Sequence, residues 1–120
     1  MSYNTEYKLT LLTGHNFKWK PHNAIAIIAD LRNSLNENAR DFFSEDAKYA
    51  IDTTGNFNEP CRWYESESEL TEFSKKYPDI LFILDMFGEE ARDIRRDYFH
   101  NGNHQEAVVT ITYSEFEIKQ

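Results

Sequence analysis

The chain has 120 residues and a mass of 14.2 kDa, enough for one domain with one hydrophobic core. Its 21 acidic and 13 basic residues give a net charge of −8, which argues against a protein that grips nucleic acid through a basic surface. An aromatic content of 15% argues against disorder, and the lone Cys61 and the lack of a membrane-length apolar run predict a soluble cytoplasmic protein.

Residues 3–22 predict a strand and a loop. Polar and apolar side chains alternate from Tyr3 to Thr13, which is the period of a half-buried strand. The loop that follows holds Trp19 between two lysines, a pattern that fits either a contact site or a tryptophan packed over the edge of the core. Pro21 suits the entry to a helix.

The next part of the chain predicts a helix and two strands. Asn23 to Asn36 has the apolar spacing of a helix with one buried stripe. The stripe consists of Ala24, Ile27, Ile28, Leu31 and Leu35. Further elements are expected as a short helical turn within Asn38 to Asp46, a strand from Lys48 to Thr53, a turn over residues 53–56, and a strand from Phe57 to Tyr64 with Pro60 at a sheet edge.

A second helix and the last strands are expected from residue 66 onward. Ser66 and Glu69 have the spacing of a capping box, and Pro78 stops the helix that they open. Ile80 to Phe87 is apolar on both faces, as in a central strand. Residues 94–100 fit a helix or a strand, and the Asn-Gly pair at 101–102 before the β-rich stretch 107–113 favours a hairpin.

This order of elements predicts an α+β fold of the ferredoxin-like type. The pattern βαββαβ gives an antiparallel sheet with two helices on one face, and a C-terminal β-hairpin is added to it. Residues 1–120 are expected to form this single domain.

The second half of the chain resembles the YubB-like ferredoxin-like proteins encoded by phages and plasmids. The similarity covers about residues 61–102. It is carried by Arg62-Trp63-Tyr64, Leu70, Phe73 to Asp79, Phe82, Gly88-Glu89-Glu90, Asp93-Ile94, Tyr98-Phe99 and Asn101-Gly102. The chain differs from the family at Ala91-Arg92 and Arg95, where the family has a glycine and an aromatic residue. The resemblance implies the fold and a mobile-element origin, and it implies no catalytic residues.

The residues that carry chemistry elsewhere do not form a recognisable catalytic set here. His100 and His104 are interrupted by a turn, so a metal site would require them to meet across the hairpin. Cys61 fits a small core residue, and no glycine-rich phosphate loop is present. Asp85 with two following glutamates fits a solvated turn. We therefore expect no enzyme, no cofactor and no metal site.

The acidic residues are the leading candidates for a binding surface. An array of carboxylates can occupy the basic groove of a nucleic-acid enzyme, although acids in the first turn of a helix also stabilise its dipole and add solubility. The candidate partner-binding residues are Glu65, Glu67, Glu69, Glu72, Glu89, Glu90, Asp93, Asp97, Trp19 and Tyr64.

The expected function is that of a small acidic phage or mobile-element protein that binds and modulates a host protein in the bacterial cytoplasm. The expected partner is a nucleic-acid-handling defence enzyme, which the protein would inhibit as anti-CRISPR or anti-restriction proteins do, with mimicry of DNA as one route. The alternative is a nucleic-acid-binding accessory protein that uses the exposed sheet face, with Arg62 and Tyr64 as the partial match. Direct nucleic-acid binding is disfavoured by the charge, and an exposed hairpin edge permits a dimer.

Overall fold

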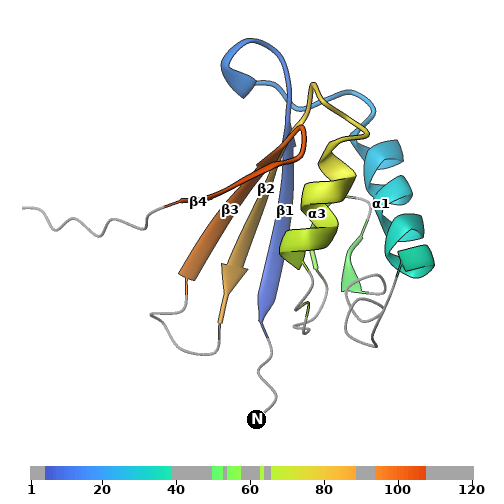
Figure 1. The fold of residues 1–120 in the computed structure, drawn as a ribbon, viewed down its shortest axis with the longest axis vertical. Coiled ribbons are helices and arrows are strands. Elements are labelled where there is room, and N and C mark those ends of the chain that lie inside the picture. The colour runs from blue at the N-terminus through green and yellow to red at the C-terminus, as the bar shows by residue number, and fades with distance from the viewer. Residues whose placement is uncertain are drawn as a thin grey trace, which may run out of the picture.

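The computed structural model describes residues 5–38, 50–52, 54–57, 63, 66–88 and 94–107. Within these residues the fold is α+β, with a four-stranded antiparallel sheet and two helices (Figure 1). The elements are β1 (Glu6–Leu12), the 3-10 turn η1 (His15–Phe17), α1 (Ala24–Asn38), α3 (Ser66–Ser74), β2 (Leu81–Phe87), β3 (Ile94–His100) and β4 (Asn103–Ala107). The strands lie in the order β1-β2-β3-β4.

The alternation of β1 and the two-sided apolar character of β2 decide their places in the sheet. Leu9 and Leu11 of β1 are buried, whereas Lys8, on the sheet face away from the helices, is exposed. Leu84 of β2 pairs with Leu9 on one side and with Asp97 of β3 on the other. The prediction of a central strand over these residues is confirmed, because β2 has a hydrogen-bonded neighbour on each edge.

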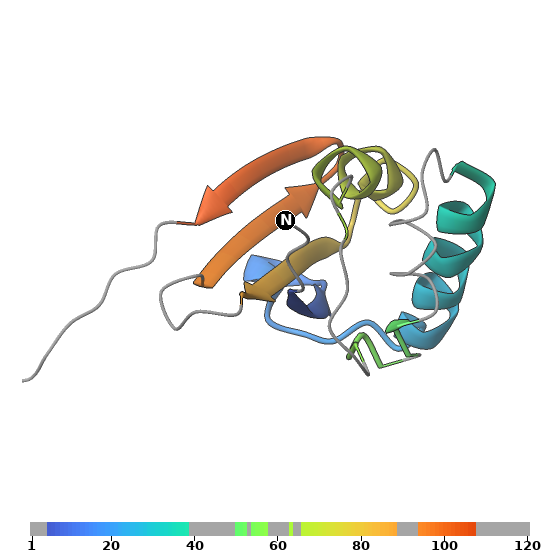
Figure 2. The same ribbon diagram turned by 90° about the horizontal axis from the view of Figure 1, so that it is seen from below.

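Both helices lie on one face of the sheet (Figure 2). The predicted stripe of α1 is confirmed, since all five of its residues are buried. From α3, Leu70 and Phe73 enter the same core, where the ring of Phe73 meets that of Phe82 at 5.7 Å. Each large side chain that is buried in this way contributes about 1.5–3 kcal/mol of hydrophobic stabilisation.

Only parts of the two strands expected before α3 lie within the described residues. Ala50 is helical, and the described residues around it form single antiparallel bridges, Ile51 with Phe57 and Lys8 with Asn56. The Asp52 carboxylate accepts hydrogen bonds from the amides of Thr54 and Asn56, at 2.8 and 3.2 Å, in the region where a turn was predicted.

Much of that segment, including Asn38 to Asp46 beyond the end of α1 and most of Phe57 to Tyr64, lies outside the described residues. The described part of the chain therefore supports the α+β fold, and the two middle strands of a ferredoxin-like order are represented there only by bridges.

A tight turn at Asn101 and Gly102 joins β3 to β4. Both residues have positive φ angles, 46° and 81°, as the primed hairpin turns require. Phe99 pairs with His104 across the two strands, so residues 94–100 are a strand. The stretch 108–113, which was expected to continue the second strand, lies outside the described residues.

Candidate functional site

The predicted acidic candidates that the structure describes are engaged with other parts of the protein. Asp97 is only 1% exposed, because it lies on the helix-facing side of β3. Its Oδ1 lies 3.1 Å from Nε of Arg95 and 3.2 Å from Nε2 of His104. The other ring nitrogen of His104 lies 3.2 Å from Oε1 of Glu67 on α3. The His104 ring therefore lies between two of the predicted carboxylates, although its buried Nε2 makes no hydrogen bond within the described residues.

Glu69 and Glu72 have partners of their own. Glu69 accepts a hydrogen bond from Nε1 of the buried Trp63 at 3.1 Å. Glu72 forms an exposed ion pair with Lys75 at 2.9 Å. The remaining candidates on the acidic list, together with one aromatic, lie outside the described residues: Glu65, Glu89, Glu90, Asp93 and Tyr64. Glu67 and Glu69 thus join α3 to its surroundings, Asp97 is buried, and Glu72 is an exposed carboxylate paired with its neighbour Lys75.

The two histidines of the hairpin lie on opposite faces of the sheet and do not meet. His104 stacks on Phe99 beneath α3, with ring centroids 5.0 Å apart. His100 meets the ring of Phe17 at 5.1 Å. Within the described ranges, no group of three or more His, Cys, Asp or Glu side chains is arranged to hold a metal ion.

The sheet face that points away from the helices carries a mixture of charges and apolar side chains. Arg96 of β3 forms a bidentate pair with Asp85 of β2, at 2.5 and 3.2 Å, and its hydrogen bonds to Asp85 and Tyr98 raise the pKa of its guanidinium. Phe87 and Ile94, a cross-strand pair, are 43% and 47% exposed. Of the basic side chains on this face in the described strands, Arg96 is already paired with a carboxylate, and Lys8 is exposed.

The most exposed aromatic side chain in the described residues is Trp19. Its backbone is fixed by two hydrogen bonds with Thr13, one in each direction, at 2.6 and 3.1 Å. Its indole lies over Gly14, where a Cβ atom would come within 2.6 Å of Cδ1. The side chain is nevertheless 67% exposed. The loop thus keeps a large apolar side chain exposed to water, on a backbone that hydrogen bonds hold in place.

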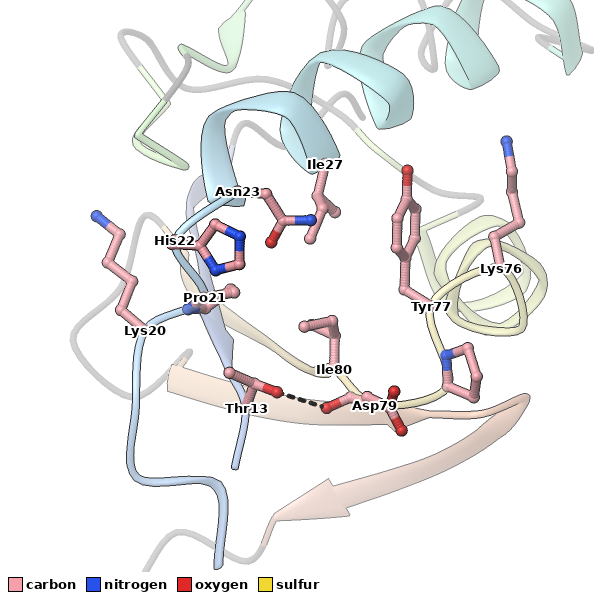
Figure 3. Close-up of a pocket in the computed structure, with 11 residues that line it drawn as sticks. Thr13, Lys20, Pro21, His22, Asn23, Ile27, Lys76, Tyr77, Asp79 and Ile80 are labelled. Atoms are coloured by element: carbon pink, nitrogen blue, oxygen red, sulfur yellow. Dashed lines mark hydrogen bonds between the residues drawn. The ribbon is translucent and has the colours of Figure 1, made fainter. Parts of the chain in front are cut away.

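A cavity of about 480 Å³ lies next to this loop, between the start of α1 and the end of α3 (Figure 3). Ile27, Pro21 and Ile80 contribute apolar surface, and Thr13 donates a hydrogen bond from Oγ1 to the carbonyl of Asp79 at 3.0 Å. Lys20, His22 and Lys76 also line it, with Asn23, Tyr77 and Pro78.

A polar contact between the two helices forms one wall of the cavity. Tyr77 donates from its hydroxyl to Oδ2 of Asp30 on α1 at 2.7 Å, and Nζ of Lys76 lies 3.1 Å from the same atom. The hydrogen bond to Asp30 raises the pKa of Tyr77 to about 12, and the one from Tyr77 lowers the pKa of Asp30. By contrast, neither Lys18 nor Lys20 forms an ion pair with any residue that the structure describes.

Sequence reasoning selected Trp19 and missed the cavity beside it. The lining residues come from three separate segments: the end of β1, the start of α1 and the turn after α3. The pairs Pro21-His22 and Tyr77-Pro78 were interpreted only as helix boundaries. Two lysines on either side of Trp19 are unusual in a chain of net charge −8 and indicate a contact surface. They do not predict a cavity next to it.

Comparison with known proteins adds no relative. No family model matches the chain, and neither a curated protein nor a solved structure matches it. None of the helices in the described part of the chain has the length and apolar character that a bilayer crossing demands.

Proposed function

We propose that this protein binds and modulates another protein through the surface around Trp19. One observation carries the proposal: a tryptophan that is 67% exposed stands on a loop whose backbone is held by two hydrogen bonds. Burying such a side chain against a partner removes a large apolar area from water. Tryptophan is among the residues that dominate binding energy at interfaces.

The rigidity of the loop strengthens the proposal. An anchor that is already held in place loses little conformational freedom on binding, so more of its interaction energy becomes affinity. Gly14 and Thr13 supply that restraint here. A tryptophan that only covered the edge of the core would not need its backbone to be held by hydrogen bonds in this way.

The resemblance of residues 61–102 to phage and plasmid proteins is the reason to place the partner in a bacterial host. We keep a nucleic-acid-handling defence enzyme as the proposed partner and the ferredoxin-like arrangement as the proposed fold type. Mimicry of DNA is the less favoured mode of binding, because the described carboxylates Glu67, Glu69, Glu72 and Asp97 all have partners within the protein.

The experiment is a tagged pull-down of the full chain from bacterial lysate, followed by mass spectrometry. We expect a stoichiometric partner that Trp19→Ala loses and that the matched variant Phe87→Ala retains, because Phe87 is exposed at a different part of the sheet. Trp19→Ala is expected to keep the unfolding midpoint of the parent protein, since Trp19 is 67% exposed, whereas Phe87→Ala, at a residue that is 43% exposed, is expected to lower it modestly and remain folded.

Excess DNA in the wash distinguishes DNA mimicry from binding at a surface that does not compete with DNA. A partner retained despite the DNA uses a surface of its own, and a partner displaced by it points to mimicry of the substrate. Capture that is equal for Trp19→Ala and the parent protein would contradict the proposal.

A further inference from the structure

We infer that the cavity beside Trp19 accepts an apolar side chain from an acidic segment of the protein partner. The inference rests on the proposed function, which it deepens by naming the chemistry of the partner. It depends on the cavity, on the charges around it and on its position next to the exposed indole.

The size and lining of the cavity suit an apolar side chain. Its volume of about 480 Å³ lies within the range of roughly 300–1,000 Å³ that is usual for pockets that enclose a ligand. Ile27, Ile80 and Pro21, which line it, have no polar side-chain atoms, and the ring of Tyr77 lies on the opposite side from His22 (Figure 3). The hydroxyl of Tyr77 already donates a hydrogen bond to Asp30, so a side chain that enters the cavity does not need to supply an acceptor for it.

The charges around the cavity favour carboxylates beside that side chain. Lys20 and Lys18 have no ion pair in the described residues, and Lys76, although it contacts Asp30, keeps 55% of its side chain exposed. The opposing charges are Asp79 in the lining and Asp30 beside Lys76, and Lys18 lies next to Trp19 without lining the cavity. The first turn of α1, which starts at the cavity, contains no acidic residue to offset its partial positive charge.

This local excess of positive charge contrasts with the net charge of −8 of the whole chain. A partner segment rich in carboxylates is repelled by the rest of the surface and is attracted here. Such an arrangement directs the segment to one place and sets its orientation, which is how complementary charges contribute to specificity.

Trp19 and the cavity form one continuous region along the chain, because Lys20 and Pro21 follow the tryptophan directly and line the cavity. A partner that covers the indole therefore passes over the cavity mouth. The occupant is thus a side chain near the residues that contact Trp19, with the carboxylates on either side of it.

The test is a two-dimensional NMR titration of the full chain with blocked heptapeptides. Three probes have three glutamates on each side of a central Leu, Phe or Trp. Two controls have serine at the centre, or lysine in place of every glutamate. We expect at least one acidic probe at millimolar concentration to shift the amides of Thr13, Lys20 and Tyr77, whereas neither control does so. Equal shifts with the lysine peptide, or no shift at these amides with any acidic probe, would overturn the inference.

Charge-reversal variants test the same point on the captured partner. The double variant Lys18→Glu with Lys20→Glu replaces two attractions by repulsions, and we expect about tenfold weaker binding at low salt, corresponding to about 1.4 kcal/mol. The matched control is Lys8→Glu, an exposed lysine on the sheet face away from the helices. A binding constant that the double variant leaves unchanged, with Trp19 still required, overturns the inference and leaves the proposed function standing. Absence of any Trp19-dependent partner overturns both.

Discussion

Gly102 donates its backbone N–H to Oγ of Ser74 at 2.8 Å. The bond joins the turn of the β3–β4 hairpin to the last residue of α3, and Ser74 is 0% exposed. Ser74 in turn donates to the carbonyl of Thr71 at 2.8 Å. One buried hydroxyl thus satisfies a turn amide and a helix carbonyl, which fixes the hairpin against the helix layer.

Ser74→Ala tests this connection. Removing the hydroxyl leaves the Gly102 amide without its acceptor, and we expect the free energy of unfolding to fall by about 1–3 kcal/mol. Urea denaturation followed by tryptophan fluorescence measures the change. Glu72→Ala on the same helix removes only an exposed ion pair and should cost less than about 1 kcal/mol. Similar losses for the two variants would contradict a structural role for the hydroxyl.

Gly55 and Gly14 are expected to differ in their tolerance of a side chain. Both have positive φ angles, 91° and 83°, so alanine is strained by about 1 kcal/mol or more at either position. A Cβ on Gly55 would lie 2.1 Å from the backbone oxygen of Leu9, whereas one on Gly14 would lie 2.6 Å from a side-chain atom, Cδ1 of Trp19. We expect Gly55→Ala to lower the thermal midpoint well below that of Gly14→Ala, as measured by circular dichroism. The reverse order would contradict this reading.

The contact between Tyr77 and Asp30 predicts a pH-dependent contribution to stability. The pKa of Tyr77 is raised from 10 to about 12, so the folded state favours the protonated phenol. Its contribution is complete below pH 10 and disappears as the pH rises through 12. Tyr77→Phe is therefore expected to cost about 1–2 kcal/mol at pH 7 and to match the parent protein near pH 12, in paired urea titrations. A constant difference across this range would argue against the contact.

Absorbance titration at alkaline pH provides the control. In the parent protein one tyrosine should ionise near pH 12, and Tyr77→Phe should lose that step and keep the others. The pKa of Asp30 is lowered by the hydrogen bond from Tyr77, so its contribution persists as the pH falls and is lost only below the usual range of aspartate.

Asp97 is expected to matter for folding far more than Glu67, although both were candidates for the same acidic surface. Asp97→Ala removes a buried carboxylate and leaves the Nε of Arg95 without its acceptor, which we expect to cost about 1–3 kcal/mol. Glu67→Gln alters a side chain that is 61% exposed and should cost less than about 1 kcal/mol. Differential scanning calorimetry compares the two, and equal costs would refute the distinction.

The periodicity of apolar residues predicted the helices and strands that bury one face and expose the other. The stripe of α1 and the alternation of β1 follow directly from the apolar positions, because burial alone decides them. The strand character of β2 followed from its lack of a polar face. The helix that opens at Ser66 was also expected, although it ends at Ser74, before Tyr77 and Pro78.

The failures have a different origin. Asp97 was counted with the exposed acids because residues 94–100 were ambiguous; once they are a strand, it shares a face with Phe99 and must be buried. The cavity depends on three segments that meet only in the folded chain.

The two outer strands of the sheet differ in how they can meet another chain. The outer edge of β1 is occupied, since Leu9 donates its N–H to the carbonyl of Gly55 at 2.8 Å and Thr13 pairs with Trp19. In the described residues, no strand pairs with the outer edge of β4. Within the described residues, a further strand can therefore be added at β4 and not at the bonded part of β1. Two copies that met at β4 would each keep β1 at the far end of the joint sheet, where Gly55 and Trp19 already bond to that edge.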